Sequence, residues 1–150
     1  MQRDVDRLVR AAQNLTGVWP TQAPPAIPGR PARQIGGASY AAHLLGNLKD
    51  PRGVEVLVPL LNDEEVADIV PWSLGEIGDR RSIGPLRERM ERDDPSVRVL
   101  TILALETLNA REALPKLQAL LQDTRPSNFG NRTTVAEAAR RAIAVLSRLR

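Results

Sequence analysis

The sequence predicts an all-α fold, a short α-solenoid in which helix pairs stack into an α-α superhelix. Three observations predict it: a repeat, helical spacing of apolar residues within each repeat, and helix start signals at the matching places. Leu48, Ile77 and Leu108 align at steps of 29 and 31 residues. Leu146 aligns with these three residues after a longer step of 38 residues. We expect the additional residues of this step, which fall in the polar stretch 123–132, to form an inserted loop. Repeats of this length indicate stacked helix pairs.

The first segment of each repeat has the pattern of an amphipathic helix. Apolar residues recur at i, i+3, i+4, i+8 and i+11, the spacing of one helix face. The matching columns hold Val66, Ile69, Val70, Leu74 and Ile77, then Val97, Leu100, Leu105 and Leu108, then Val135, Ala138, Ala139, Ile143 and Leu146. Asp94 before Pro95 predicts a capped helix start, and Thr134 with Glu137 predicts a capping box.

The second segment of each repeat is a shorter helix. These segments are residues 53–61, 83–90 and 113–121. Pro85 and Pro115 align, so each helix is expected to begin shortly before its proline. Pro71 is expected to interrupt the first helix of the second repeat, and the last repeat is expected to consist of a single helix.

At 150 residues the chain has the length of one domain. Residues 1–15 are predicted to form an amphipathic capping helix, and residues 38–150 form the repeat array. Between them, residues 16–37 contain five prolines and four glycines and are not expected to be helical. Two interpretations of this segment remain open. It is either a linker on the surface or an internal ligand that occupies a binding surface.

Three short motifs carry a family resemblance. Asp94–Arg98 reads DPSVR, Leu74–Asp79 reads LGEIGD, and Ala113–Pro115 reads ALP. In combination, over about residues 38–146, they resemble the short HEAT-like repeats of the phycobilisome-lyase type. That family contains bilin lyase subunits and related chromophore-handling factors as well as scaffolds, so the resemblance implies a helical-repeat fold and permits an accessory role in chromophore or cofactor attachment.

The residues needed for most catalytic and metal chemistry are scarce. The chain has no cysteine and one histidine, His43, which removes thiolate sites and nucleophile-histidine dyads. The acidic residues Asp63, Glu64, Glu65 and Asp68 are explained by their favourable position at a helix start. We therefore predict no catalytic residue, no metal site and no cofactor. The opening residues hold no long apolar run, so a cytoplasmic protein without a membrane anchor is expected.

The leading functional hypothesis is a protein-protein interaction scaffold. The resemblance implies that second helices line a concave face, where charged side chains would grip an acidic or mixed-charge segment of a protein partner. The predicted binding residues are Arg52, Glu55, Arg80, Arg81, Glu88, Arg111, Glu112 and Lys116. The alternative left open is a solvated charged surface with no partner.

A second hypothesis is binding of nucleic acid by the basic C-terminal third. The net charge of +3 divides into +3 for residues 1–40, −5 for residues 41–94 and +5 for residues 95–150. A cluster of arginines is a pattern typical of phosphate binding. The candidates are Arg125, Arg132, Arg140, Arg141, Arg148 and Arg150.

One set of equivalent positions, on the side of the first helices that faces away from the core, predicts an interface. We call this set the outer column. This column holds His43, Trp72, Leu103 and Arg141. Helical geometry directs Trp72, Val99 and Leu103 away from the core. Adjacent exposed apolar residues mark interfaces, so we expect these three to be covered by residues 16–37 or by a second copy in a homodimer. The alternative is that packing between neighbouring repeats fills these positions.

Overall fold

The computed structural model of the chain describes residues 37–63, 66, 69–128 and 132–148. In these residues the first helices of the repeats are α2 (Gly37–Leu48), α4 (Ile69–Ile77), α6 (Pro95–Thr107) and α8 (Val135–Ser147). The second helices are α3 (Arg52–Leu57), α5 (Ile83–Arg89) and α7 (Leu114–Ala119). Short 3-10 turns flank them: η2 (Pro59–Asn62), η3 (Arg80–Ser82), η4 (Arg111–Ala113) and η5 (Leu120–Gln122). The all-α prediction is confirmed, and the one β-bridge among the described residues joins Pro126 to Thr134.

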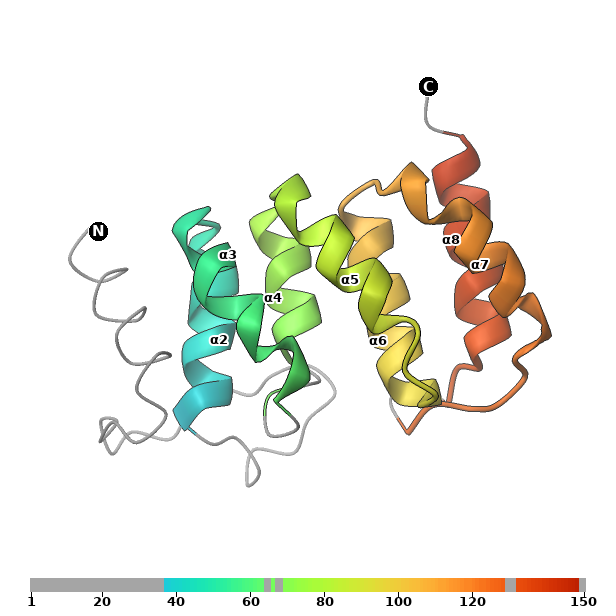
Figure 1. Cartoon of the computed structure of the whole chain (residues 1–150), viewed down its shortest axis with the longest axis horizontal. Coiled ribbons are helices and arrows are strands. Elements are labelled where there is room, and N and C mark those ends of the chain that lie inside the picture. Colours follow the sequence, from blue (N-terminus) through green and yellow to red (C-terminus); the bar gives the residue numbers. More distant parts are fainter. Residues whose placement is uncertain (1–36, 64–65, 67–68, 129–131, 149–150) are drawn as a thin grey trace.

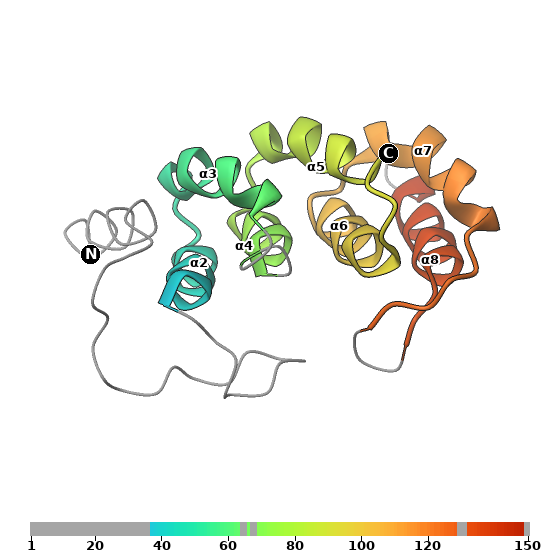
Figure 2. The same ribbon diagram turned by 60° about the horizontal axis from the view of Figure 1, so that its bottom comes forward.

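The helices form two layers. Figure 2 shows the first helices α2, α4, α6 and α8 side by side in one layer and the second helices α3, α5 and α7 in the other. Each first helix packs against the next, and α5 and α7 also pack across the layers against α6 and α8. The chain therefore advances through the array one helix pair at a time, as Figure 1 shows from a second direction. This architecture is the predicted α-solenoid.

Equivalent leucines form the core between the layers. Leu45, Leu74 and Leu105 are fully buried at equivalent positions of successive first helices. In the second helices Leu57, Leu86 and Leu117 are likewise fully buried and keep the steps of 29 and 31 residues. Because each repeat contributes apolar side chains to its neighbours, the stack buries one continuous core.

The first three of the first helices each end at a residue with a left-handed backbone conformation. Lys49, Gly78 and Asn109 occupy equivalent positions and have φ angles of 53°, 76° and 54°. A residue in this left-handed region ends an α-helix and turns the chain away from its axis. Only Gly78 does so without a side-chain penalty. The repeat is therefore fixed by its turns as well as by its apolar pattern.

The predicted helix starts are confirmed. The Asp94 side chain accepts hydrogen bonds from the backbone N–H groups of Ser96 and Val97. Thr134 and Glu137 form the complete capping box. The expectation for Pro71 was wrong, because α4 begins at Ile69 and places this proline in the first helical turn, where no intrahelical N–H is required.

Two predicted segments lie outside the described residues. These are the capping helix of residues 1–15 and, except for Gly37, the segment 16–37. Within the described ranges, no helix has the length and apolar character needed to cross a membrane.

Candidate interaction surfaces

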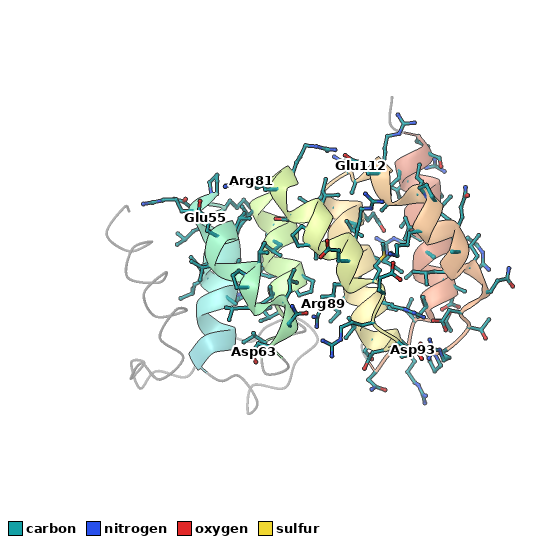
Figure 3. The ribbon with its side chains drawn as sticks, in the orientation of Figure 1. Glu55, Asp63, Arg81, Arg89, Asp93 and Glu112 are labelled. Atoms are coloured by element: carbon teal, nitrogen blue, oxygen red, sulfur yellow. The ribbon has the colours of Figure 1, made fainter. Side chains whose placement is uncertain are left out.

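Most of the predicted binding residues lie on one edge of the array, where each first helix turns into its second helix. Arg52 begins α3, Arg80 and Arg81 lie in η3, and Arg111 begins η4. Figure 3 shows Glu55, Arg81 and Glu112 along this edge. We call the set the arginine rim. It comprises Asp50, Arg52, Glu55, Asp79, Arg80, Arg81, Arg111 and Glu112.

Two turns of the rim have the same Asp-x-Arg structure. Asp50 Oδ1 accepts hydrogen bonds from the backbone N–H and the Nε of Arg52 at 2.9 and 3.0 Å. Asp79 Oδ1 accepts from the backbone N–H of Arg81 at 2.9 Å, and Asp79 Oδ2 accepts from Arg81 Nη2 at 2.8 Å. Hydrogen bonds from these guanidinium groups lower the pKa of both carboxyls. Each arginine therefore folds back onto an aspartate of its own turn.

The rim also links neighbouring repeats. Arg81 Nη2 donates to the carbonyl oxygen of Pro51 at 3.2 Å, and Arg81 Nη1 lies 3.6 Å from Glu55 Oε1. In the other direction, Arg80 pairs directly with Glu112 of the third repeat. A hydrogen bond from its own backbone N–H, followed by the hydrogen bond and the charge of Arg80, holds the pKa of Glu112 below its usual range. Within the described chain, the rim therefore neutralises most of its own arginines.

Three predicted binding residues stand apart from these pairs. Arg111 follows Ala110 where the other turns have aspartate, and it forms no ion pair within the described residues. Glu88 is exposed on α5. Lys116 lies inside α7 and pairs with Glu91, which follows α5. Asp50 and Asp79 were not predicted as site residues, although the recurring Asp-x-Arg motif of the sequence is a signal for them.

A second ionic cluster fixes the inserted loop at the opposite edge. Asp123 Oδ2 accepts from Arg98 Nη1 and from Arg125 Nη2, both at 2.8 Å, and Asp123 Oδ1 accepts from Arg125 Nε at 2.8 Å. Arg125 Nη2 also donates to Asp93 at 2.7 Å. The Asp123 side chain is only 10% exposed. Hydrogen bonds from Arg125 and then Arg98 hold its pKa far below the usual range. We call these four residues the Asp123 clamp.

The clamp weakens the hypothesis that the basic C-terminal third binds nucleic acid. Arg125 is held by Asp93 and Asp123, and Arg141 lies 3.4 Å from Glu106. Arg132, Arg140 and Arg148 are exposed, and Arg150 lies outside the described residues. Two of the six arginines proposed to contact phosphates are thus already paired with carboxylates of the chain.

The predicted apolar interface divides into three environments. Val99, which helical geometry directed outward, is only 3% exposed and belongs to the core, because α6 is flanked by both α4 and α8. Trp72 is half-buried and stacks on His43 with ring centroids 4.8 Å apart. Leu103 remains 38% exposed. Packing between repeats therefore accounts for Val99 and much of Trp72, which leaves Leu103 as the exposed member.

Replacing Leu103 by glutamate is expected to leave the free energy of unfolding within about 0.5 kcal/mol of the wild type, because the side chain is exposed on a helix face. Urea unfolding measures this change. The molar mass, measured by light scattering, tests the homodimer hypothesis on the same variant. A large loss of stability or a shift from dimer to monomer would show that another segment or a second copy covers Leu103.

His43 has the environment of a packing residue. It is 7% exposed, and burial lowers the pKa of its imidazole. Its Nε2 lies 3.1 Å from Asn47 Nδ2, and its ring stacks on Trp72. Among the residues that the structure describes, no group of three or more acidic or histidine side chains is arranged to hold a metal ion.

Comparison with known proteins agrees with this architecture. The family model described as HEAT repeats matches residues 37–98. The bilin biosynthesis protein PecE of Mastigocladus laminosus is 36% identical over 54% of this chain and 31% of its own length. The phycocyanobilin lyase subunit alpha of a Picosynechococcus species is 36% identical over 55% of this chain and 35% of its own. The chain thus spans about a third of the length of these curated relatives.

A solved structure has the same fold. It is the complex of CpcE and CpcF of phycocyanin lyase from a Nostoc species, with a TM-score of 0.70 at 20% identity over 99% of this chain and 55% of that chain. The two-layer helical array with its buried leucine columns is an α-solenoid repeat protein. More specifically, its sequence and fold resemble those of HEAT-like repeat proteins of the phycobilisome-lyase type.

Proposed function

We propose that this chain is a protein-binding module that takes part in the attachment of a bilin chromophore to a phycobiliprotein. The observation that carries the proposal is its similarity to proteins named for bilin biosynthesis and for a phycocyanobilin lyase subunit. The structural neighbour is a complex of two proteins, which supports the binding of a protein partner. A repeat array suits this task because it presents an extended, rigid surface.

The charges of the second-helix layer favour a partner segment of mixed charge. Most arginines of the rim are already paired with carboxylates of the chain. An acidic partner would have to displace those carboxylates before it could bind the arginines. Three exposed side chains of the layer form no ion pair within the described residues, namely Arg87, Glu88 and Arg111. Because these groups carry both signs, a segment with both acidic and basic residues complements them best.

Capture experiments with matched variants test the proposal. The tagged full chain is incubated with extract from cells that make phycocyanin, and the retained proteins are identified by mass spectrometry. We expect the wild type to retain a phycocyanin subunit or a lyase subunit, because the solved neighbour is a complex of two proteins of phycocyanin lyase. The triple reversal Arg87→Glu, Glu88→Arg and Arg111→Glu should reduce retention by about tenfold or more.

The control exchanges the charges of an existing pair. The swap Arg80→Glu with Glu112→Arg keeps opposite charges at the two positions and should retain the partner as the wild type does. Equal retention by the triple reversal would refute the mixed-charge mode of binding. Retention of neither kind of protein by the wild type would refute the proposed role in chromophore attachment.

A further inference from the structure

The last residue of α5, Arg89, is buried and has no partner among the residues that the structure describes. It is 5% exposed, and its Nε and Nη1 nitrogens are buried with no hydrogen-bond acceptor. It forms no ion pair within the described residues. Figure 3 shows it in the half of the array that holds Asp63 and Asp93, away from the arginine rim. Buried polar atoms in native proteins are nearly always paired, so this guanidinium requires an explanation.

The other repeats show that the fold does not need an arginine here. In the frame that aligns Leu57, Leu86 and Leu117, the positions equivalent to Arg89 hold Leu60 and Leu120. Both leucines are partly buried and pack against the core. A leucine thus fills this position in the first and third repeats. Burial of a cation in its place costs free energy unless an anion compensates it.

The described charged groups near Arg89 do not neutralise its positive charge. Burial lowers its pKa and the charge of Arg92 lowers it further, while the charge of Asp94 acts in the opposite direction. The Asp94 carboxylate accepts hydrogen bonds from the N–H groups of Ser96 and Val97, where it caps α6. An arginine remains protonated at neutral pH even when buried. The described chain therefore leaves one positive charge and several N–H donors unsatisfied at this junction.

We propose that Arg89 anchors a binding site for a carboxylate group at the end of α5, where this helix packs against η2 and α6. A carboxylate suits the site better than a phosphate dianion, because a single guanidinium lacks a partner and the negative charge of Asp94 lies close by. This site is independent of the proposed role in chromophore attachment and of the charges tested for it.

Stability of the chain alone tests the first consequence. If no internal anion compensates Arg89, the variant Arg89→Leu should raise the melting temperature by about 4 °C or more in chloride buffer. Arg89→Met serves as a second variant, because its flexible side chain adapts to an irregular space. Arg87→Leu, on the exposed side of the same helix, should change the melting temperature little. Loss of stability in both Arg89 variants would overturn the proposal by showing that the chain supplies a partner itself.

Binding tests the second consequence. At constant pH and ionic strength, replacement of chloride by acetate should raise the melting temperature of the wild type and of Arg87→Leu but not that of Arg89→Leu. Phosphate should have a weaker effect than acetate. A hexaglutamate peptide, with hexaglutamine as its control, tests whether the site binds a carboxylate that belongs to a protein chain. In that case hexaglutamate should raise the melting temperature at a far lower concentration than acetate does. The absence of any Arg89-dependent response to acetate and to hexaglutamate would overturn the site while leaving the capture experiment unaffected.

Discussion

The variant Asp123→Ala is expected to lower the free energy of unfolding by about 2–3 kcal/mol, because it removes several hydrogen bonds from charged groups at once. Its carboxylate accepts from the side chains of Arg98 and Arg125 at 2.8 Å. The side chain of Arg98 is only 16% exposed and would lose the better-buried of its two acidic partners. The backbone carbonyl of Asp123 still accepts from the N–H of Ala136, so the effect isolates the side chain. Urea unfolding measures the loss.

The matched control is Asp93→Ala in the same clamp. Asp93 is 79% exposed, so its pair with Arg125 is screened by water and its removal should have a much smaller effect. Equal losses for the two variants would show that burial does not govern the strength of the clamp. A loss that is confined to Asp123→Ala would assign the attachment of the inserted loop to this one carboxylate.

The same carboxylate makes stability depend on pH. Its pKa is far lower in the folded chain than the ordinary value of 3.8, because Arg125 and Arg98 favour the ionised form. The folded state therefore binds fewer protons than the unfolded state at this position, and the contribution is fully present above the unfolded pKa. It is lost as the pH falls below 3.8 toward the folded value. We expect the fall in stability of the wild type below this pH to be shallower in Asp123→Ala.

The second large effect is expected at Gly46, where α2 and α4 approach closely. A Cβ atom at this position would lie 2.9 Å from Ser73 Cα and 3.0 Å from Trp72 Cζ3. A backbone atom cannot move aside as the end of a flexible side chain can. The variant Gly46→Leu should therefore lower the free energy of unfolding by about 3 kcal/mol, because the two helices must separate.

A glycine in open space provides the control. A Cβ at Gly84, inside α5, would meet nothing within 4 Å. Gly84→Ala should therefore raise the free energy of unfolding by about 0.5–1 kcal/mol, because alanine restricts the unfolded chain and favours the helix. Thermal unfolding of the two variants should give shifts of opposite sign. Destabilisation of similar size at both positions would contradict the close approach of α2 and α4.

Local signals in the sequence were sufficient to predict the repeat and its helices. The columns that contain Leu74 and Leu105 predicted the buried face of the first helices, and Asp94 and Thr134 predicted their starts. These signals are readable because helix periodicity and capping involve residues within about four positions of one another. Pro71 was misjudged for a related reason, since the effect of a proline depends on where the helix begins.

The sequence by itself determined the helix pairs, their order and the absence of cysteine chemistry. The tertiary structure decided which charges are paired, because the partners of Arg80 and Arg98 lie 32 and 25 residues away along the chain. It also decided that Val99 is buried, since α6 has neighbours on two sides rather than one. It revealed that Arg89 takes the place of a core leucine and that its buried Nε and Nη1 have no acceptor in the described part of the chain. Pairing and burial depend on the distances between helices of different repeats, and helical periodicity within a single repeat does not specify those distances.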